Sequence, residues 1–364
     1  MQKTKVLVIN TNPMIYDGIA SAIFNYAENM DKSDLLMDFV AINYPENSIY
    51  DRIKKMDSKL YIIPYRTKRT LKYIFCLFKL IKKNRYNIVH IHGSSCIMAI
   101  EMIAARLAGT EACPHSHNTN CQHKLLHKLF KPLFNLLYNN GFACSIEAGH
   151  WLYGNNHFEV INNGINVSKY SFNEFERQKY RKQYGLKNDE IGIINIAHFT
   201  EVKNHVFLIN VFKKVIEQKK KYKLLLLGQG NMKNTIEKMV KEYDLQEKVI
   251  FAGVTQNIPG LLSACDLMVL PSLYEGFPFT AVEAQASGIK CLVSDKVTRN
   301  CCFSDFFEYL ELEENLWVSK ILNISNNYDR IGLCNKNKNS IENAGYDIKA
   351  ISNKLKSLYI KYKN

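Results

Sequence analysis

The sequence has no long hydrophobic run and no cysteine spacing that suggests a disulfide framework. No apolar stretch reaches the roughly 20 residues that a membrane-spanning helix requires, which argues against an integral membrane protein. The ten cysteines form no Cys-x-x-Cys motif, and several lie in apolar stretches, as reduced and buried thiols do. The chain begins directly on a strand-like stretch, so we expect no signal peptide and a cytoplasmic protein.

The composition is that of an ordinary globular protein, but the charge is uneven. Hydrophobic residues make up 47% and charged residues 23% of the 364 residues, which excludes a disordered, collagen-like or coiled-coil chain. This length suggests about two domains. The formal net charge is +14, and residues 52–131 contain 16 basic but only three acidic residues. Such a segment suits an anionic partner, although solubility alone is the simpler explanation.

Strand-like and helix-like patterns alternate in both halves of the chain. Continuous β-branched and apolar runs, such as KVLVIN at 5–10, are typical of strands that are buried on both faces. The predicted strands are 5–10, 38–43, 60–63, 87–91, 141–144, 191–197, 223–227, 249–252, 267–270 and 290–294. The predicted helices are 18–30, 70–83, 96–107, 205–219, 232–243, 258–264, 279–287 and about 315–324.

This alternation predicts parallel strand pairing through βαβ crossovers. We therefore predict an α/β chain of two Rossmann-like, doubly wound parallel-sheet domains that face a central cleft, with ligands at the carboxyl ends of the strands. The expected domains are residues 1–168 and 169–345, with the polar stretch 170–187 as a candidate connection. A basic helix at 346–364 is expected to pack back on the first domain.

The strongest local motif is LMVLPSLYEGFPFTAVEAQASG at 267–288. A strand leads into a loop that carries Glu275, and Pro278 then opens a helix that contains Glu283. The free backbone N–H groups of a helix start suit a phosphate, and a carboxylate accepts hydrogen bonds from sugar hydroxyls. The alternative is a capped surface helix with two incidental acids.

This motif resembles the signature of the retaining nucleotide-sugar glycosyltransferases of family four, which have the GT-B fold. The second half also resembles that family in INIAHFTEVKNH (194–205), LLGQGNM (226–232) and VIFAGVTQNIPGLLSACD (249–266). The first half resembles the capsule and exopolysaccharide branch of the family in PHSHNT (114–119), ACSIEAG (143–149) and NNGI (162–165). The resemblance covers essentially the whole chain.

The resemblance implies roles for individual residues. Glu283 would bind the ribose hydroxyls of the donor nucleotide, Glu275 the hydroxyls of the transferred sugar, and Lys203 the diphosphate. His117 would lie near the reacting sugar carbon and would be catalytic together with Glu275 and Lys203. Simpler alternatives are an ordinary surface lysine at Lys203 and a plain helix start at Gly18. The other implied donor-binding residues are Gly18, His198, Gly228, Gly230, Gly276, Phe277 and Pro278.

Two positions depart from the usual pattern of the family. His198 stands where arginine is common, and a histidine binds a diphosphate less reliably because it is not always charged. Asp17 precedes Gly18 where the family loop often has a second glycine, and a carboxylate there would repel a diphosphate unless it pointed away. These departures leave two alternatives open: an inactive binding partner of an active transferase, and a nucleotide-sugar isomerase of the same fold.

Two His-x-His pairs raise the question of a metal site. His90 with His92, and His115 with His117, could each share one face of a strand and bind zinc. No acid or cysteine completes a convincing ligand set, and the sequence has no Asp-x-Asp pair of the kind that holds a divalent ion. We therefore expect no metal and no cofactor, with Lys203, His198 and helix-start amides handling the charge of the leaving group.

Basic and apolar residues interleave at 66–85 and 123–138, in the presumed acceptor domain. This pattern favours contact with an anionic membrane surface, and the absence of a recognised nucleic-acid module argues against nucleic acid as a partner. Together with the resemblance, it leads us to expect a retaining transferase on the inner face of the plasma membrane. Its donor would be a nucleotide-diphosphate sugar, with UDP expected, and its acceptor a lipid-linked oligosaccharide in capsule or exopolysaccharide assembly.

Overall fold

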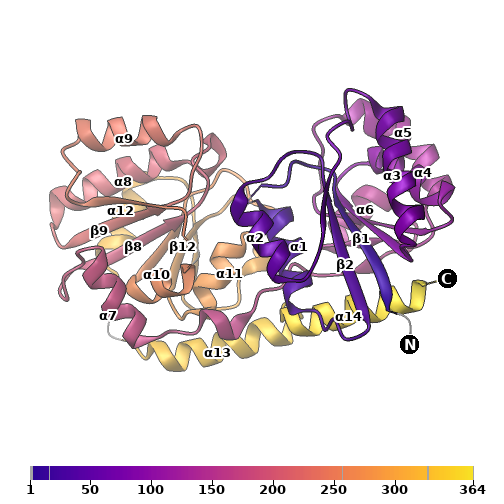
Figure 1. Cartoon of the computed structure of the whole chain (residues 1–364). Helices are drawn as coiled ribbons and strands as arrows, with labels where there is room; N and C mark the ends of the chain where they lie inside the picture. Colours follow the sequence, from indigo (N-terminus) through magenta and orange to yellow (C-terminus); the bar gives the residue numbers. More distant parts are fainter. Residues whose placement is uncertain (1–2, 16, 256, 326–327, 364) are drawn as a thin grey trace. The chain divides into compact units, whose positions relative to one another are not determined.

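The computed structural model describes residues 3–363 apart from 16, 256 and 326–327. The chain divides into two compact units, one formed by Met1–Gly164 with Gly345–Asn364 and the other by Ile165–Ala344 (Figure 1). Each unit is built around one parallel β-sheet that is covered by helices. The predicted α/β fold with two parallel-sheet domains is therefore confirmed.

The first unit contains a seven-stranded parallel sheet in the order β3-β2-β1-β4-β5-β6-β7. The strands are β1 (Thr4–Asn10), β2 (Leu35–Ala41), β3 (Leu60–Ile62), β4 (Ile88–Gly93), β5 (Glu111–Ser116), β6 (Phe142–Ala143) and β7 (Glu159–Val160). The helices are α1 (Gly18–Asn29), α2 (Asn47–Lys55), α3 (Thr70–Asn84), η1 (Cys96–Met98), α4 (Ala99–Leu107), α5 (Lys124–Leu137), α6 (Ile146–Tyr153) and α14 (Ile348–Tyr362).

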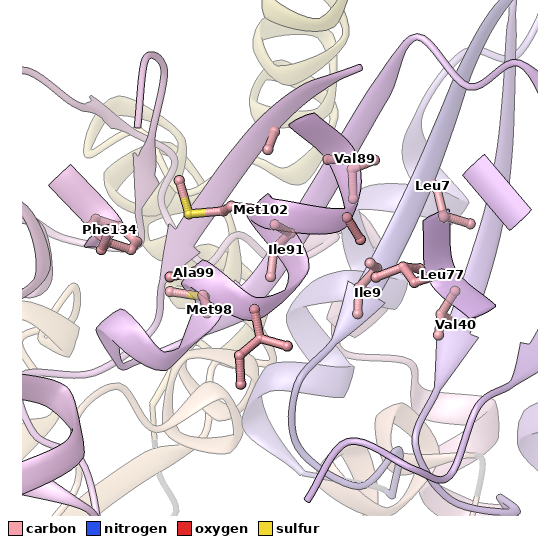
Figure 2. Close-up of a cluster of buried hydrophobic side chains, with 14 of the residues drawn as sticks. Leu7, Ile9, Val40, Leu77, Val89, Ile91, Met98, Ala99, Met102 and Phe134 are labelled. Carbon is pink, nitrogen blue, oxygen red and sulfur yellow. The ribbon is translucent and has the colours of Figure 1, made fainter. Parts of the chain in front are cut away.

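A hydrophobic core holds β1 and β4 against α3 and α4 (Figure 2). Leu7 and Ile9 of β1 and Ile91 of β4 are fully buried, as are Leu77 of α3 and Met102 of α4. Fully burying a side chain of this size stabilises the fold by about 1.5–3 kcal/mol. The core therefore fixes the positions of β1 and β4 in the sheet.

The last helix, α14, is part of the first unit although it ends the chain. It packs on α1, where Ser352 Oγ donates a hydrogen bond to the carbonyl of Tyr26 at 3.1 Å. Its Tyr359 is buried, and the Tyr359 hydroxyl lies 2.5 Å from Nδ1 of His90 in β4. The C-terminal helix thus contacts both α1 and the middle of the sheet.

The second unit contains a six-stranded parallel sheet in the order β10-β9-β8-β11-β12-β13. The strands are β8 (Ile191–Ile196), β9 (Tyr222–Leu227), β10 (Val249–Gly253), β11 (Leu267–Leu270), β12 (Lys290–Ser294) and β13 (Phe307–Leu310). The helices are η2 (Val167–Tyr170), α7 (Glu174–Gln183), η3 (Glu201–Lys203), α8 (His205–Gln218), α9 (Lys233–Glu242), α10 (Ile258–Ala264), α11 (Phe279–Ala286), η4 (Arg299–Cys301), α12 (Glu314–Leu322) and α13 (Arg330–Asn343).

The prediction that 170–187 connects two domains is wrong. This stretch contains α7, which packs against α10 inside the second unit. Arg177 and Arg181, one helical turn apart on α7, both pair with the Asp266 carboxylate, at 2.7 and 3.2 Å. The polar residues that indicated a solvated connection therefore hold the helix on the sheet, because a buried carboxylate needs partners.

Several elements were not predicted. β5 carries a proline and three polar residues in EACPHS, and β13 (FEYL) has a glutamate among its four residues, so neither shows a continuous apolar run. Within the part of the chain that the structure describes, no helix combines the length and the apolar character needed to cross a membrane.

Candidate functional site

The loops that follow β8 and β11 meet at the carboxyl edge of the second sheet. These two strands are parallel neighbours, so the loops that leave them start side by side. The backbone N–H of Leu273 donates to the carbonyl of Val202 at 2.8 Å, which joins the loops. The Lys203 ammonium forms an ion pair with the Glu275 carboxylate. Two of the predicted catalytic residues, 72 positions apart in the chain, are therefore in direct contact.

Glu275 is held by more than its ion pair. Ser272 Oγ donates to Oε1 of Glu275 at 2.9 Å, the same oxygen that Lys203 contacts. The side chains of Lys203 and Glu275 are 24% and 11% exposed, so both remain reachable from solvent. An ammonium group suits a phosphate, and a positioned carboxylate suits sugar hydroxyls. Ser272 was not predicted as a site residue, and its place three residues before Glu275 is the only sequence signal for it.

The start of α11 lies in the same loop. Pro278 is the N-cap residue of the helix and makes no side-chain hydrogen bond to its first turn. A Cβ on Gly276 would have only the Tyr274 hydroxyl nearby, at 3.7 Å, so the loop is open at this position. The rings of Phe277 and Phe279 meet edge to face, 5.5 Å apart. An uncapped helix start of this kind offers backbone N–H groups to an anion.

Glu283 lies on α11 and is buried, with 7% of its surface exposed. Burial raises the pKa of its carboxyl group, and a hydrogen bond from the Tyr170 hydroxyl, 2.6 Å from Oε1, opposes that increase. Tyr170 belongs to η2, 113 positions earlier. The sequence carried no signal for this contact. It orients the carboxylate and leaves the second oxygen for another donor.

Gly228 and Gly230 are required by the packing of the chain itself. Both have positive φ values, 142° and 153°, which favour glycine. A Cβ would lie 2.1 Å from the carbonyl oxygen of Ala197 at Gly228, and 2.4 Å from that of Phe199 at Gly230. The 228–230 loop therefore lies directly on the loop after β8. Nδ1 of His198 is consequently 3.1 Å from the carbonyl oxygen of Gln229.

Asp17 and Gly18 open the first helix of the first unit. The Asp17 carboxylate accepts a hydrogen bond from the backbone N–H of Ala20 at 2.8 Å and so caps α1. A Cβ added to Gly18 would meet no atom of the chain within 4 Å. The aspartate that departs from the family pattern thus has a structural task, whereas nothing in the fold of the unit itself requires glycine at position 18.

The histidines of β4 and β5 form one buried cluster in the first unit. His92 is the register partner of His115 in these adjacent parallel strands, and His117 directly follows β5. Nδ1 of His92 lies 2.7 Å from Nε2 of His117, and Nε2 of His90 lies 3.1 Å from Nδ1 of His115. Burial lowers the pKa of all four, that of His117 to about 3, so the rings are neutral near pH 7.

This cluster bears on the metal question. Ring nitrogens of His90, His92 and His115 all lie within 4.8 Å of one another, and neutral imidazoles are the form that binds metals. Several of the nitrogens are already paired with each other or with Tyr359, whereas Nε2 of His115 has no partner among the described residues. The expectation that the protein needs no metal stays a prediction.

The chain matches known protein families along most of its length. Residues 16–169 match the family described as Glycosyltransferase Family 4, and residues 176–302 match the family described as Glycosyl transferases group 1. The putative glycosyltransferase EpsF of Bacillus subtilis (strain 168) is 31% identical over 296 residues, which are 77% of each chain. A UDP-Gal:alpha-D-GlcNAc-diphosphoundecaprenol alpha-1,3-galactosyltransferase of Escherichia coli is 26% identical over 312 residues, 80% of each chain.

Solved structures show the same fold at low sequence identity. Anabaena Alr3699/HepE in complex with UDP-glucose has a TM-score of 0.77 at 16% identity and covers 98% of this chain and 99% of its own. A glycosyltransferase from Rickettsia africae ESF-5 has a TM-score of 0.76 at 14% identity, over 100% of this chain and 99% of its own. Given the two sheets, the two family matches and these relatives, the chain belongs to glycosyltransferase family 4 and is a glycosyltransferase of the GT-B fold.

Proposed function

We propose that the chain is a retaining enzyme that moves a sugar from a UDP-sugar to a lipid-linked oligosaccharide during capsule or exopolysaccharide assembly. The names of two relatives support the acceptor, since the Escherichia coli and Campylobacter jejuni enzymes act on diphosphoundecaprenol-linked sugars. The UDP and UDP-glucose complexes of Alr3699/HepE support the donor. A relative from the cps region of Klebsiella pneumoniae supports the pathway.

The contact between Lys203 and Glu275 carries this proposal. A donor diphosphate bound at the uncapped start of α11 would draw the Lys203 ammonium toward its charge. Glu275 would then be free to accept hydrogen bonds from hydroxyls of the transferred sugar. Lys203, His198 and the helix-start N–H groups would stabilise the departing diphosphate without a metal ion. Retention would follow from attack on the leaving-group face, with the leaving phosphate accepting the proton of the acceptor.

The other predicted donor contacts belong to the same proposal. Glu283, oriented by Tyr170, would accept hydrogen bonds from the ribose diol through its second oxygen. Gly18 would let the donor approach the backbone, which agrees with the empty space around this residue. His117, neutral at working pH, would act on the transferred sugar as a hydrogen-bond partner rather than as a cation.

We also propose that the protein binds the inner face of the plasma membrane through α3 and α5. On α3, Leu71 is 84% and Phe75 53% exposed, and they are interspersed with exposed lysines. On α5, Leu125 is 80% and Leu129 70% exposed. Apolar side chains beside lysines favour an anionic bilayer, with each base near the surface contributing about 1 kcal/mol. Sedimentation with liposomes that shows no dependence on anionic lipid would refute this part.

Transfer and donor hydrolysis by matched variants test the enzymatic proposal. Lys203→Met and Glu275→Gln should abolish both reactions. Lys214→Met removes a lysine from the surface ion pair with Glu314, 2.8 Å long and in the same unit, and should leave both reactions unchanged. A wild-type protein that binds a UDP-sugar but neither transfers nor hydrolyses it would favour the inactive binding partner. NMR that shows a UDP-sugar changing without acceptor would favour the isomerase.

A further inference from the structure

A cavity of about 400 Å³ opens on the first unit, next to α5 and α6. It is lined by Lys124, His127, Lys128 and Lys131 of α5 and by Trp151 of α6. Its volume lies in the usual range for pockets that bind small ligands. Among the residues that the structure describes, no acidic side chain lines it. The chain therefore offers a hollow with only positive and aromatic side chains on its walls.

The lysines of this cavity form one basic face, and few groups of the protein pair with their charges. Lys124, Lys128 and Lys131 are spaced by four and three positions, which places them on the same side of the helix. In the described part of the chain, no ion pair involves any of them, and only Lys131 donates a hydrogen bond, to the carbonyl of Leu152. Like charges at this spacing repel each other, so an anion in the cavity would remove a repulsion.

The aromatic wall of the cavity is held in place by the turn after β4. The rings of His127 and Trp151 stack with centroids 4.7 Å apart and planes 23° from parallel. Trp151 Nε1 donates to the carbonyl of Ser94 at 2.9 Å, and the backbone N–H of Cys96 donates to Nδ1 of His127 at 3.2 Å. The wall is thus positioned before any ligand arrives, while the exposed lysines of α5 can adjust to it.

An apolar stripe runs along α5 beside the lysines. Leu125, Leu129 and Leu136 are 80%, 70% and 77% exposed and share another side of the helix, at spacings of four and seven. Solvent-exposed leucines in a row are unfavourable for a helix that binds only a small soluble anion. A ligand that joins an anionic head to a hydrocarbon chain would use both stripes at once.

We propose that this cavity binds the diphosphate head group of a polyprenyl-type lipid, with the leucine stripe lying in the bilayer surface. The identity of this lipid as the anchor of the acceptor rests on the proposed function. A diphosphate carries enough negative charge to engage the three lysines together, and its hydrogen bonds to ammonium groups are charge-assisted. The stacked pair of His127 and Trp151 would cover the first apolar carbons of the chain.

Binding to nanodiscs tests the cavity separately from bulk charge. The probes are phosphatidylcholine discs with undecaprenyl diphosphate, and discs with phosphatidylglycerol at equal negative charge. Lys124→Gln/Lys128→Gln removes two exposed lysines of the cavity. Lys79→Gln/Lys83→Gln removes two exposed lysines at the same spacing on α3, with the same change in net charge. We expect both double variants to weaken binding to phosphatidylglycerol discs to a similar extent. On diphosphate discs, we expect the α5 double variant to weaken binding by at least about tenfold more than the α3 variant does.

Two results would overturn the inference. One is that both double variants weaken binding to diphosphate discs equally. The other is that the wild type binds both kinds of disc equally well. Thermal unfolding at an unchanged midpoint establishes that the variants are folded. Hydrolysis of a UDP-sugar without acceptor is measured alongside and separates the two proposals. If the protein hydrolyses the UDP-sugar, but its binding to diphosphate discs does not depend on Lys124 and Lys128, then only the proposal for the cavity is refuted. Cavity-dependent binding by a protein that neither hydrolyses nor transfers refutes the proposed function and supports the cavity.

Discussion

Lowering the pH from 7.5 to 5.5 should destabilise the first unit far more than the second. His90, His92, His115 and His117 have pKa values lowered by burial, so they stay neutral in the folded unit. In the unfolded chain they take up protons near pH 6.5. The unfolded state therefore binds more protons below that pH, and stability is lost as the pH falls through it.

The size of the effect follows from the number of histidines that remain neutral. Each one whose folded pKa lies well below 5.5 contributes a loss of about 1.4 kcal/mol over these two pH units. The cluster of His90, His92, His115 and His117 therefore accounts for at most roughly 5 kcal/mol, which is comparable to the whole stability of many domains. The second unit has a single histidine of this kind, His205, whose pKa burial lowers to about 4. Its expected loss from histidine is roughly 1.4 kcal/mol.

The two tryptophans of the chain allow each unit to be followed by itself. Trp151 lies in the first unit and Trp317 in the second. Trp317→Phe therefore leaves a reporter for the first unit, and Trp151→Phe one for the second. Urea unfolding followed by fluorescence at pH 7.5, 6.5 and 5.5 yields the free energy of unfolding from each. Transition midpoints and slopes are compared rather than intensities, because protonated histidine can quench a nearby indole.

A loss below about 1.4 kcal/mol in the first unit, the contribution of one proton, would refute the reasoning. An equal loss in both units would also refute it. His123→Gln is the matched control, because this histidine is exposed and belongs to the same unit. Its removal should leave the pH dependence unchanged.

Three other predictions address the loops, the second unit and the metal. Gly228→Ala should destabilise the second unit by roughly 1–3 kcal/mol or more in urea unfolding, because its Cβ would lie 2.1 Å from the Ala197 carbonyl oxygen. Gly18→Ala should leave stability nearly unchanged but weaken UDP-sugar binding, as measured by calorimetry; unweakened binding would contradict the role of this glycine. Asp266→Asn should destabilise the second unit by roughly 3–5 kcal/mol, because it leaves Arg177 and Arg181 without their carboxylate. A loss below about 1 kcal/mol, the value typical of a surface ion pair, would contradict this. EDTA should not change transfer activity, and a loss that a divalent ion restores would contradict the metal-free expectation.

Most of the fold could be predicted from sequence because strands buried on both faces are continuous apolar runs. β11 (LMVL) follows this pattern throughout, β9 (YKLLLL) follows it after Lys223, and β8 (IGIINI) follows it apart from Asn195. β5 breaks it, since EACPHS places histidine and proline in a buried strand. α7 was misassigned for a related reason: its arginines are polar in sequence but are satisfied by Asp266 in the fold.

The sequence by itself determined the two parallel-sheet units and the kinds of chemical groups at their loop ends. Only the tertiary structure decided which of these groups meet. Lys203 and Glu275 are in contact because β8 and β11 are adjacent in the sheet although they are far apart in the chain. Tyr170 reaches Glu283 because η2 packs against α11. Residue types and local periodicity are properties of the chain, whereas strand order and side-chain pairing depend on how buried polar groups find partners once the sheets have formed.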